Sequence, residues 1–210
     1  MPIDVIVFDF DGVILDSVEI KTRTFGELFK DYGPEAVKYV TSYHERHGGV
    51  SRYVKFRHYY DKLLGREITD EEMRELDRRF NETALEQLSK TPLLPGVRDF
   101  IEYAYGKWPL YVASGAPNKE LAYLLELFAI SDYFKGVYGS PPPKSENLAT
   151  IIARESADPA KVLMVGDSGT DLAAGEDNGA LFLGVGDFPA RPSIPDLSHM
   201  REALKREFNS

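Results

Sequence analysis

Short apolar runs rich in β-branched residues alternate along this chain with segments of helical period. The runs lie at residues 5–8, 110–113, 136–138, 162–165 and 181–185. Between the later runs, apolar residues recur every three to four positions, which is the spacing of one face of an α-helix. Because parallel strands are joined by crossover connections that are usually helical, this alternation predicts an α/β protein with a parallel sheet flanked by helices.

Residues 18–90 interrupt this alternation with helical patterns and no convincing strand. Gly33, Gly48–Gly49 and Gly65 divide the stretch, and Thr69–Glu72 has the sequence of a capping box that begins a further helix. We therefore predict four helices here, forming an inserted helical domain. The remaining residues, 1–17 and 91–210, would form the core domain, and the two connections between these domains would act as hinges.

The composition is that of an ordinary water-soluble globular protein, with 43% apolar and 28% charged residues over 210 positions. Asp and Glu outnumber Lys and Arg by 34 to 25, and this net charge of −9 disfavours a nucleic-acid partner because phosphates would be repelled. Cysteine is absent, which excludes thiolate chemistry. Without a leader or membrane-spanning pattern, we expect a cytoplasmic protein that binds no membrane, either a monomer or a homodimer.

Asp9 and Asp11 follow the first apolar run directly and precede Gly12. If the strand continued through them, both carboxylates would point to one face at the carboxyl end of a buried strand. Gly12 would let the backbone turn sharply beyond them. One carboxylate could then attack a substrate while the other moves protons. A solvated turn uses the same residue types, so this pair alone leaves both interpretations open.

Ser114, Gly115 and Ala116 end the second run and precede a helical segment. A serine hydroxyl and two backbone N–H groups in this position can surround one small anion, such as a phosphate. The alternative is that Ser114 and Gly115 only turn the chain and that Asn118 caps the following helix.

A second pair of carboxylates, Asp167 and Asp171, follows the fourth run. Ligands of open α/β sheets bind at the carboxyl ends of the strands, where Asp9 and Asp167 would meet. With the backbone carbonyl of Asp11, they offer hard oxygen ligands suited to Mg²⁺. Asp171 would bind the metal directly or through water, orient Lys144, or merely cap its helix. Lys144 follows three prolines after the third run and, taken alone, would be an ordinary solvated lysine.

Taken together and in this order, the segments at 9–13, 114–115, 144 and 166–171 resemble the four motifs of the haloacid dehalogenase superfamily. The resemblance covers essentially the whole chain. It implies a Rossmann-like core with a helical cap inserted after the first motif, as in the phosphoglycolate phosphatase and β-phosphoglucomutase-like branch of that superfamily.

Under this resemblance the protein is a Mg²⁺-dependent phosphatase that acts on a small phosphate monoester, either a sugar phosphate or a phosphoglycolate-like acid. Asp9 is the nucleophile that forms an aspartyl-phosphate, and Asp11 is the general acid and base. Mg²⁺ and the ammonium of Lys144 neutralise the carboxylate and the phosphate, which would otherwise repel each other. The implied metal ligands are Asp9, Asp11, Asp167 and Asp171, and the implied phosphate-binding residues are Ser114, Gly115 and Ala116.

The glycine-rich turn that enters a helix near residue 52 is the candidate for substrate selection. Gly49, Val50, Ser51 and Arg52 resemble the loop that contacts the non-reacting end of the substrate in β-phosphoglucomutase-like proteins. Gly49 would expose backbone N–H groups, and Arg52 would bind an anion. The alternative is a helix start capped by Ser51 with Arg52 in solvent. Of the four histidines, only His47 lies beside this tetrad and is a candidate for function.

Three other functions stay open on the sequence alone. A phosphosugar mutase is the nearest, but mutases of this branch carry His where Lys21 stands and Glu where Gly166 stands, and both departures favour hydrolysis. A phosphonate hydrolase would need a cap lysine that forms a Schiff base; Lys21 and Lys55 are available, and no motif favours either. A non-catalytic metabolite-binding protein would be favoured if a motif residue were missing, and none is.

Overall fold

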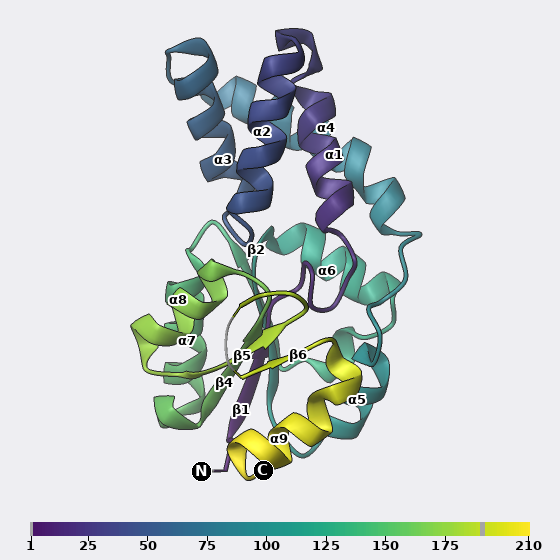
Figure 1. Cartoon of the computed structure of the whole chain (residues 1–210), viewed down its shortest axis with the longest axis vertical. Helices are drawn as coiled ribbons and strands as arrows, with labels where there is room; N and C mark the ends of the chain where they lie inside the picture. Colours follow the sequence, from purple (N-terminus) through teal and green to yellow (C-terminus); the bar gives the residue numbers. More distant parts are fainter. Residues whose placement is uncertain (1, 190–191) are drawn as a thin grey trace.

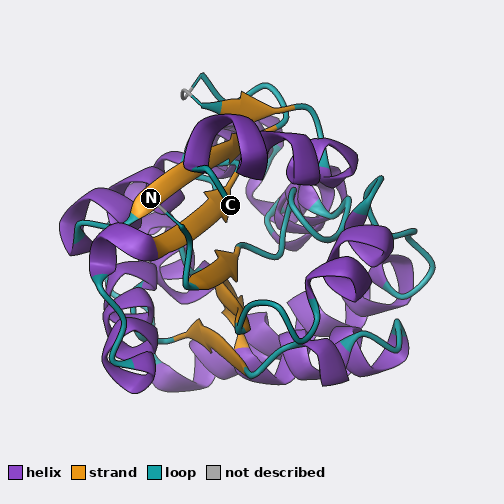
Figure 2. Cartoon of the chain, turned by 90° about the horizontal axis from the view of Figure 1, so that it is seen from below, coloured by secondary structure: helices purple, strands orange, loops and turns teal. Residues whose placement is uncertain are grey.

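The computed structural model describes residues 2–189 and 192–210, and a parallel sheet of six strands runs through them. The strand order is β3-β2-β1-β4-β5-β6, and every neighbouring pair is parallel. Figure 2 shows helices on both faces of the sheet. The predicted α/β fold is confirmed. The strands are β1 (Val5–Phe8), β2 (Leu110–Pro117), β3 (Gly136–Ser140), β4 (Val162–Gly166), β5 (Leu181–Val185) and β6 (Ser193–Ile194).

Two layers of helices cover the sheet (Figure 1). On one face lie α7 (Lys144–Glu155) and α8 (Gly169–Asn178), and on the other lie α5 (Val97–Ala104), α6 (Asn118–Leu127) and α9 (Met200–Phe208). The central strand β1 is completely buried, and its alternating side chains enter both layers. Val5 and Val7 join the apolar cluster that includes α7 and α8. Ile6 and Phe8 join the larger cluster on the opposite face.

Residues 18–88, which we call the helical insertion, contain helices and no strand. They lie beyond the carboxyl end of the sheet in Figure 1. Phe25, Phe56 and Phe80 pack edge-on or tilted against one another in their interior. The predicted capping box is confirmed, since the N–H of Glu72 donates to the hydroxyl of Thr69 over 3.2 Å. The α-helices are α1 (Val18–Leu28), α2 (Pro34–Arg46), α3 (Arg52–Tyr59) and α4 (Asp70–Leu88), the four that were predicted.

Two features of the sheet and its helices differ from the sequence-based expectations. Strand β6 is not predicted, because two residues are too few to show a periodic pattern. The suggestion that Asn118 caps α6 is wrong: Oδ1 of Asn118 accepts a hydrogen bond of 2.6 Å from the N–H of Gly139. Asn118 therefore ties the start of α6 to the neighbouring strand β3.

In the described ranges, no helix combines the length and the apolar character needed to cross a membrane.

Candidate active site

Asp9 and Asp11 lie in different surroundings although they are two positions apart. Asp9 is 1% exposed, and its Oδ1 accepts a hydrogen bond of 2.7 Å from the N–H of Phe10. Asp11 faces α1, where Nζ of Lys21 lies 2.6 Å from its Oδ2 and the hydroxyl of Ser17 donates to its Oδ1 over 2.5 Å. Because β1 ends before Asp9, a common strand face does not place the two side chains, contrary to the sequence-based argument.

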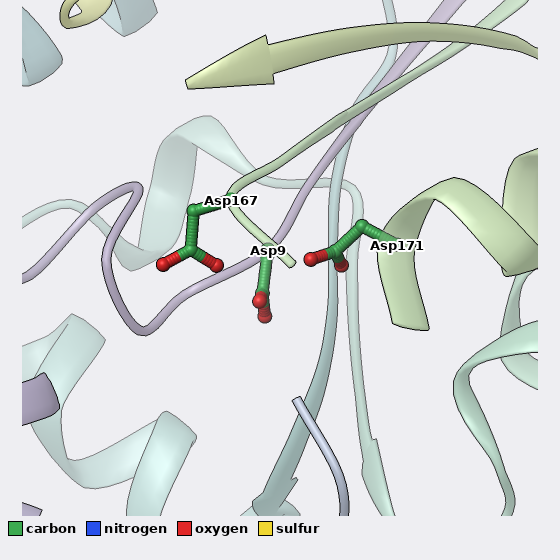
Figure 3. A group of neighbouring side chains, drawn as sticks. All are labelled: Asp9, Asp167 and Asp171. Atoms are coloured by element: carbon green, nitrogen blue, oxygen red, sulfur yellow. The ribbon is translucent and has the colours of Figure 1, made fainter. Parts of the chain in front are cut away.

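Asp9, Asp167 and Asp171 form one carboxylate cluster at the carboxyl end of the sheet. One oxygen from each lies within 4.8 Å of the others, and Figure 3 shows Asp9 between the other two. Asp9 and Asp167 follow the paired strands β1 and β4, while Asp171 lies in the first turn of α8. Gly12 leaves space for the cluster, since a Cβ atom there would lie 1.9 Å from Oδ2 of Asp167. The structure thus brings together acids that are far apart in sequence.

Lys144 connects two members of this cluster. Its Nζ lies 2.8 Å from Oδ2 of Asp9 and also contacts Oδ1 of Asp171. Oδ2 of Asp171 accepts hydrogen bonds from the backbone N–H and the hydroxyl of Ser168, over 3.1 and 2.5 Å. Both oxygens of Asp171 are therefore engaged, and one of them contacts the same ammonium that contacts Asp9.

The cluster holds more negative charge than Lys144 balances. Burial, reinforced by repulsion from Asp171, raises the pKa of Asp9 well above its ordinary value and raises that of Asp167 to about 7. Burial alone would lower the pKa of Lys144, but attraction from Asp171 and Asp9 outweighs it and raises that pKa. Carboxylate oxygens that repel one another across a few ångströms are the donor set of a hard divalent cation, so the residues present fit Mg²⁺.

Asp11 begins a chain of buried ion pairs that crosses from the core to the helical insertion. Nζ of Lys21 lies 2.6 Å from Asp11 and 2.7 Å from Glu120 on α6. Glu120 also contacts Nη1 of Arg52 at 2.7 Å, and Nε of Arg52 lies 2.8 Å from Asp77. Burial alone would raise the pKa of Asp11, but Lys21 outweighs it and lowers that pKa. We call these five residues the ion-pair chain.

Arg52 is 6% exposed, so the alternative that places it in solvent is wrong. Its guanidinium faces Asp77 and Glu120, and Nη2 donates to Oδ1 of Asn81 over 2.9 Å. A substrate anion at Arg52 would have to compete with these groups. The contact between Arg52 and the substrate's non-reacting end stays a prediction.

The turn at Gly48 and Gly49 lies directly on the core. The hydroxyl of Thr170 donates to the carbonyl of Gly48 over 3.1 Å. Gly49 has φ +72°, and a Cβ atom there would lie 1.9 Å from Oγ1 of Thr170 and 3.2 Å from Nζ of Lys144. Only glycine allows both this backbone conformation and this close approach.

The segment Ser114–Ala116 meets the same turn from the core side. A Cβ atom on Gly115 would lie 2.1 Å from the carbonyl oxygen of Gly49. The hydroxyl of Ser114, which is 1% exposed, accepts a hydrogen bond of 3.1 Å from the N–H of Ala116. One of the two N–H groups predicted to bind phosphate is thus engaged by Ser114 in this structure.

A cavity of about 220 Å³ lies between the helical insertion and this edge of the core. Asp11 and Asp167 line it from the core, and Arg52 lines it from the insertion. The sequence analysis names Lys55 without a supporting motif, although its position one turn beyond Arg52 on α3 places both on one helix face. His44 and Glu120 also line the cavity, and no local sequence pattern marks either of them.

The histidine favoured by the sequence, His47, packs against another side chain of the insertion. Its Nδ1 lies 2.8 Å from the carbonyl oxygen of Tyr43, and the two rings stack with centroids 3.8 Å apart. The structure gives His47 a packing role within the insertion, and it is His44 that faces the cavity.

A family model of haloacid dehalogenase-like hydrolases matches residues 3–179. The chain belongs to this family, which confirms the resemblance read from the four motifs.

Two curated relatives have similar lengths. The phosphoglycolate phosphatase of Haemophilus influenzae is 24% identical over 202 residues, covering 90% of each chain. That of Vibrio vulnificus is 27% identical over 192 residues, covering 87% of this chain and 83% of the relative. These relatives and the family support a phosphatase, that is, a phosphoric monoester hydrolase.

Solved structures share the fold. A predicted phosphoglycolate phosphatase from Haemophilus somnus matches with a TM-score of 0.74 and 19% identity, covering 96% of this chain and 98% of its own. A β-phosphoglucomutase from Clostridium difficile matches with a TM-score of 0.77 and 17% identity, covering 95% and 96%. Because both activities occur on this fold, the fold alone does not separate them.

Proposed function

We propose that this protein is a Mg²⁺-dependent phosphatase that hydrolyses a small phosphate monoester through an aspartyl-phosphate on Asp9. The observation that carries the proposal is the contact of 2.8 Å between Asp9 and Lys144, inside a carboxylate cluster that fits a divalent cation. A nucleophilic carboxylate reaches a phosphate dianion only if positive charge neutralises both. The site supplies one ammonium and the ligands for a metal, which is the arrangement that this reaction requires.

Asp9 and Asp167 would hold the cation, with the backbone carbonyl of Asp11 as a further ligand. When bound, the metal would neutralise charge on the attacking carboxylate and the phosphate. Asp171 is assigned to positioning Lys144, because its Oδ1 contacts the ammonium and its Oδ2 is held by the N–H and the hydroxyl of Ser168.

Asp11 would exchange the protons. After Asp9 attacks phosphorus, the leaving alkoxide takes a proton from Asp11, and in the second step Asp11 accepts one from the water that hydrolyses the aspartyl-phosphate. Lys21 lowers the pKa of Asp11 and so favours the ionised form that the second step needs. Protonating Asp11 for the first step therefore costs free energy while Lys21 stays in contact.

The helical insertion would act as a cap domain. We assign residues 18–90 to the cap and residues 1–17 and 91–210 to the core, with movement at the two connections admitting the substrate. The contact of the Gly48 turn with Thr170 would mark the closed state.

We also propose that the protein is cytoplasmic and is either a monomer or a homodimer. Size-exclusion chromatography with light scattering tests the oligomeric state.

A phosphosugar mutase is the rival function, and two positions disfavour it. Lys21 is engaged with Asp11 and Glu120, in the place where related mutases carry histidine. A Cβ atom on Gly166 would lie 2.2 Å from Cβ of Asp171, so the glutamate of the mutases has no room here.

The test is an assay of the purified protein against phosphate monoesters, with Mg²⁺ and with chelator, that measures free phosphate and isomerised sugar separately. We expect metal-dependent phosphate release. Isomerised sugar without phosphate release would establish the mutase, and no turnover of any substrate would support a metabolite-binding protein.

A further inference from the structure

Lys55 places a buried ammonium in the cavity without a carboxylate partner among the described residues. It lies on α3, is 1% exposed, and lines the same cavity as Asp11 and Gly115. Its Nζ lies 2.7 Å from Nδ1 of His44 and 5.6 Å from the centre of the Phe25 ring. Neither group carries a negative charge that would balance the ammonium.

Three other buried cations of the candidate active site differ from Lys55. Each of Lys21, Arg52 and Lys144 contacts two carboxylates. Burial lowers the pKa of Lys55 to about 7, and burial together with the charge of Lys55 lowers that of His44 to about 3. The imidazole is therefore neutral, and its Nδ1 accepts a hydrogen bond from Lys55. His44 fixes the ammonium in place without neutralising it.

The N–H donors of Lys55 that have no acceptor define what would bind there. An ammonium has three donors, and His44 uses one, so two are left for a ligand. A buried cation without a counterion is unfavourable, so burial favours loss of the proton from Lys55, and an anion that enters the cavity restores the ammonium form. A neutral sugar hydroxyl would not. The cavity of about 220 Å³ is smaller than the roughly 300–1,000 Å³ of typical ligand pockets, so the ligand must be short.

We propose that Lys55, held by His44, binds the carboxylate of a short phosphorylated organic acid whose phosphate lies at Asp9. This inference rests on the proposed phosphatase function and narrows it, since it selects acid phosphates over neutral sugar phosphates. It also assigns recognition of the non-reacting end to Lys55 in place of Arg52, whose guanidinium is occupied by Asp77 and Glu120.

The test compares Lys55→Met with wild type on 2-phosphoglycolate and on ethyl phosphate, which lacks the carboxylate. We expect kcat/KM for 2-phosphoglycolate to fall about 100-fold, the effect of removing one partner of a buried charge pair, and that for ethyl phosphate to change less than about threefold. Lys55→Arg should recover part of the loss. Lys62→Met is the control, because Lys62 is exposed and lies on the far end of the same helical segment.

The ligand-free melting temperature separates binding from folding. Removing an unbalanced buried charge should leave it unchanged or raise it in Lys55→Met, whereas a purely structural role predicts a lower value. Equal losses of kcat/KM on both substrates would overturn the proposal. So would inactivation by phosphonoacetaldehyde and borohydride with an adduct on Lys55, since that amine would react instead of pairing with an anion.

A binding measurement tests the Lys55 contact even if the proposed phosphatase function fails. If wild type hydrolyses neither substrate, calorimetry with 2-phosphoglycolate and the Asp9→Asn protein, with and without Lys55→Met, still measures the subsite. A Kd that rises about 100-fold with Lys55→Met supports the carboxylate contact, and an unchanged Kd rejects it.

Discussion

The hydroxyl of Thr170 donates a hydrogen bond of 3.1 Å to the backbone carbonyl of Gly48. Thr170 lies on α8, three residues after Asp167, and Gly48 lies in the turn between α2 and α3. The bond therefore joins the helical insertion to the helix that directly follows Asp167. Contacts of this kind can couple closure of the insertion over a substrate to the chemical step.

Gly49→Ala should impair activity much more than Gly65→Ala. Both glycines have positive φ, +72° and +63°, so alanine is strained at both positions, by about 1 kcal/mol. A Cβ atom at Gly65 meets nothing within 4 Å, whereas at Gly49 it would strike Thr170. We expect kcat/KM to fall at least about tenfold for Gly49→Ala only, measured at melting temperatures that differ little. Matching losses in the two variants would mean that the turn does not close on the core during turnover.

Asp9→Asn should lower kcat by about 1,000-fold or more, because an amide keeps the shape of the side chain but does not attack phosphorus. The protein should stay folded and should still bind its substrate. Steady-state assays with circular dichroism check this. Acid-quenched wild type should carry phosphate on Asp9, detectable by mass spectrometry, and turnover close to wild type in the variant would reject the nucleophile assignment.

Glu120→Gln should destabilise the protein by about 3 kcal/mol, because it leaves Lys21 and Arg52 buried with less negative charge. The control is Glu82→Gln, which removes an exposed pair with Arg78 and should cost less than about 1 kcal/mol. Urea unfolding measures both. Similar small losses would show that water or rearranged side chains compensate for Glu120.

The stability of the metal-free protein should depend on pH through Asp167. Its pKa is about 7 in the folded protein against 3.8 ordinarily, so the folded state retains a proton that the unfolded state has lost. This contribution is fully present below pH 3.8, declines as the pH rises toward 7, and is constant above it. In chelator, Asp167→Asn should therefore gain stability relative to wild type between about pH 4 and about pH 7.

Mg²⁺ should stabilise wild type most at pH values where the carboxyl group of Asp167 is ionised. Because the metal competes with the proton on Asp167, it should raise the melting temperature of wild type more at about pH 8 than at about pH 5. Asp167→Asn should respond weakly at both values. A thermal shift in the variant as large as in wild type would place the metal elsewhere.

The sequence predicted the sheet and the carboxylate cluster because both depend on local patterns. Asp9 and Asp167 each follow an apolar run, and parallel strands bring such positions to one edge. Local patterns did not predict the places of Glu120 and Lys55 in the site. Glu120 lies 68 positions from Arg52, its partner. Lys55 is distinguished by having no carboxylate partner within the described part of the chain, which is a property of the packed insertion and not of any sequence spacing.

The ion-pair chain also limits which insertions can be combined with this core, by protein engineering or in evolution. Its charges alternate in sign, and Glu120 of the core sits between Lys21 and Arg52 of the insertion. A change of the charge at position 21, 52 or 120 therefore leaves an unbalanced neighbour across the boundary between core and insertion. Chimeras that graft the insertion of a relative onto this core should fold when the graft has basic residues at positions 21 and 52. Otherwise the residue at position 120 must be replaced by that of the same relative.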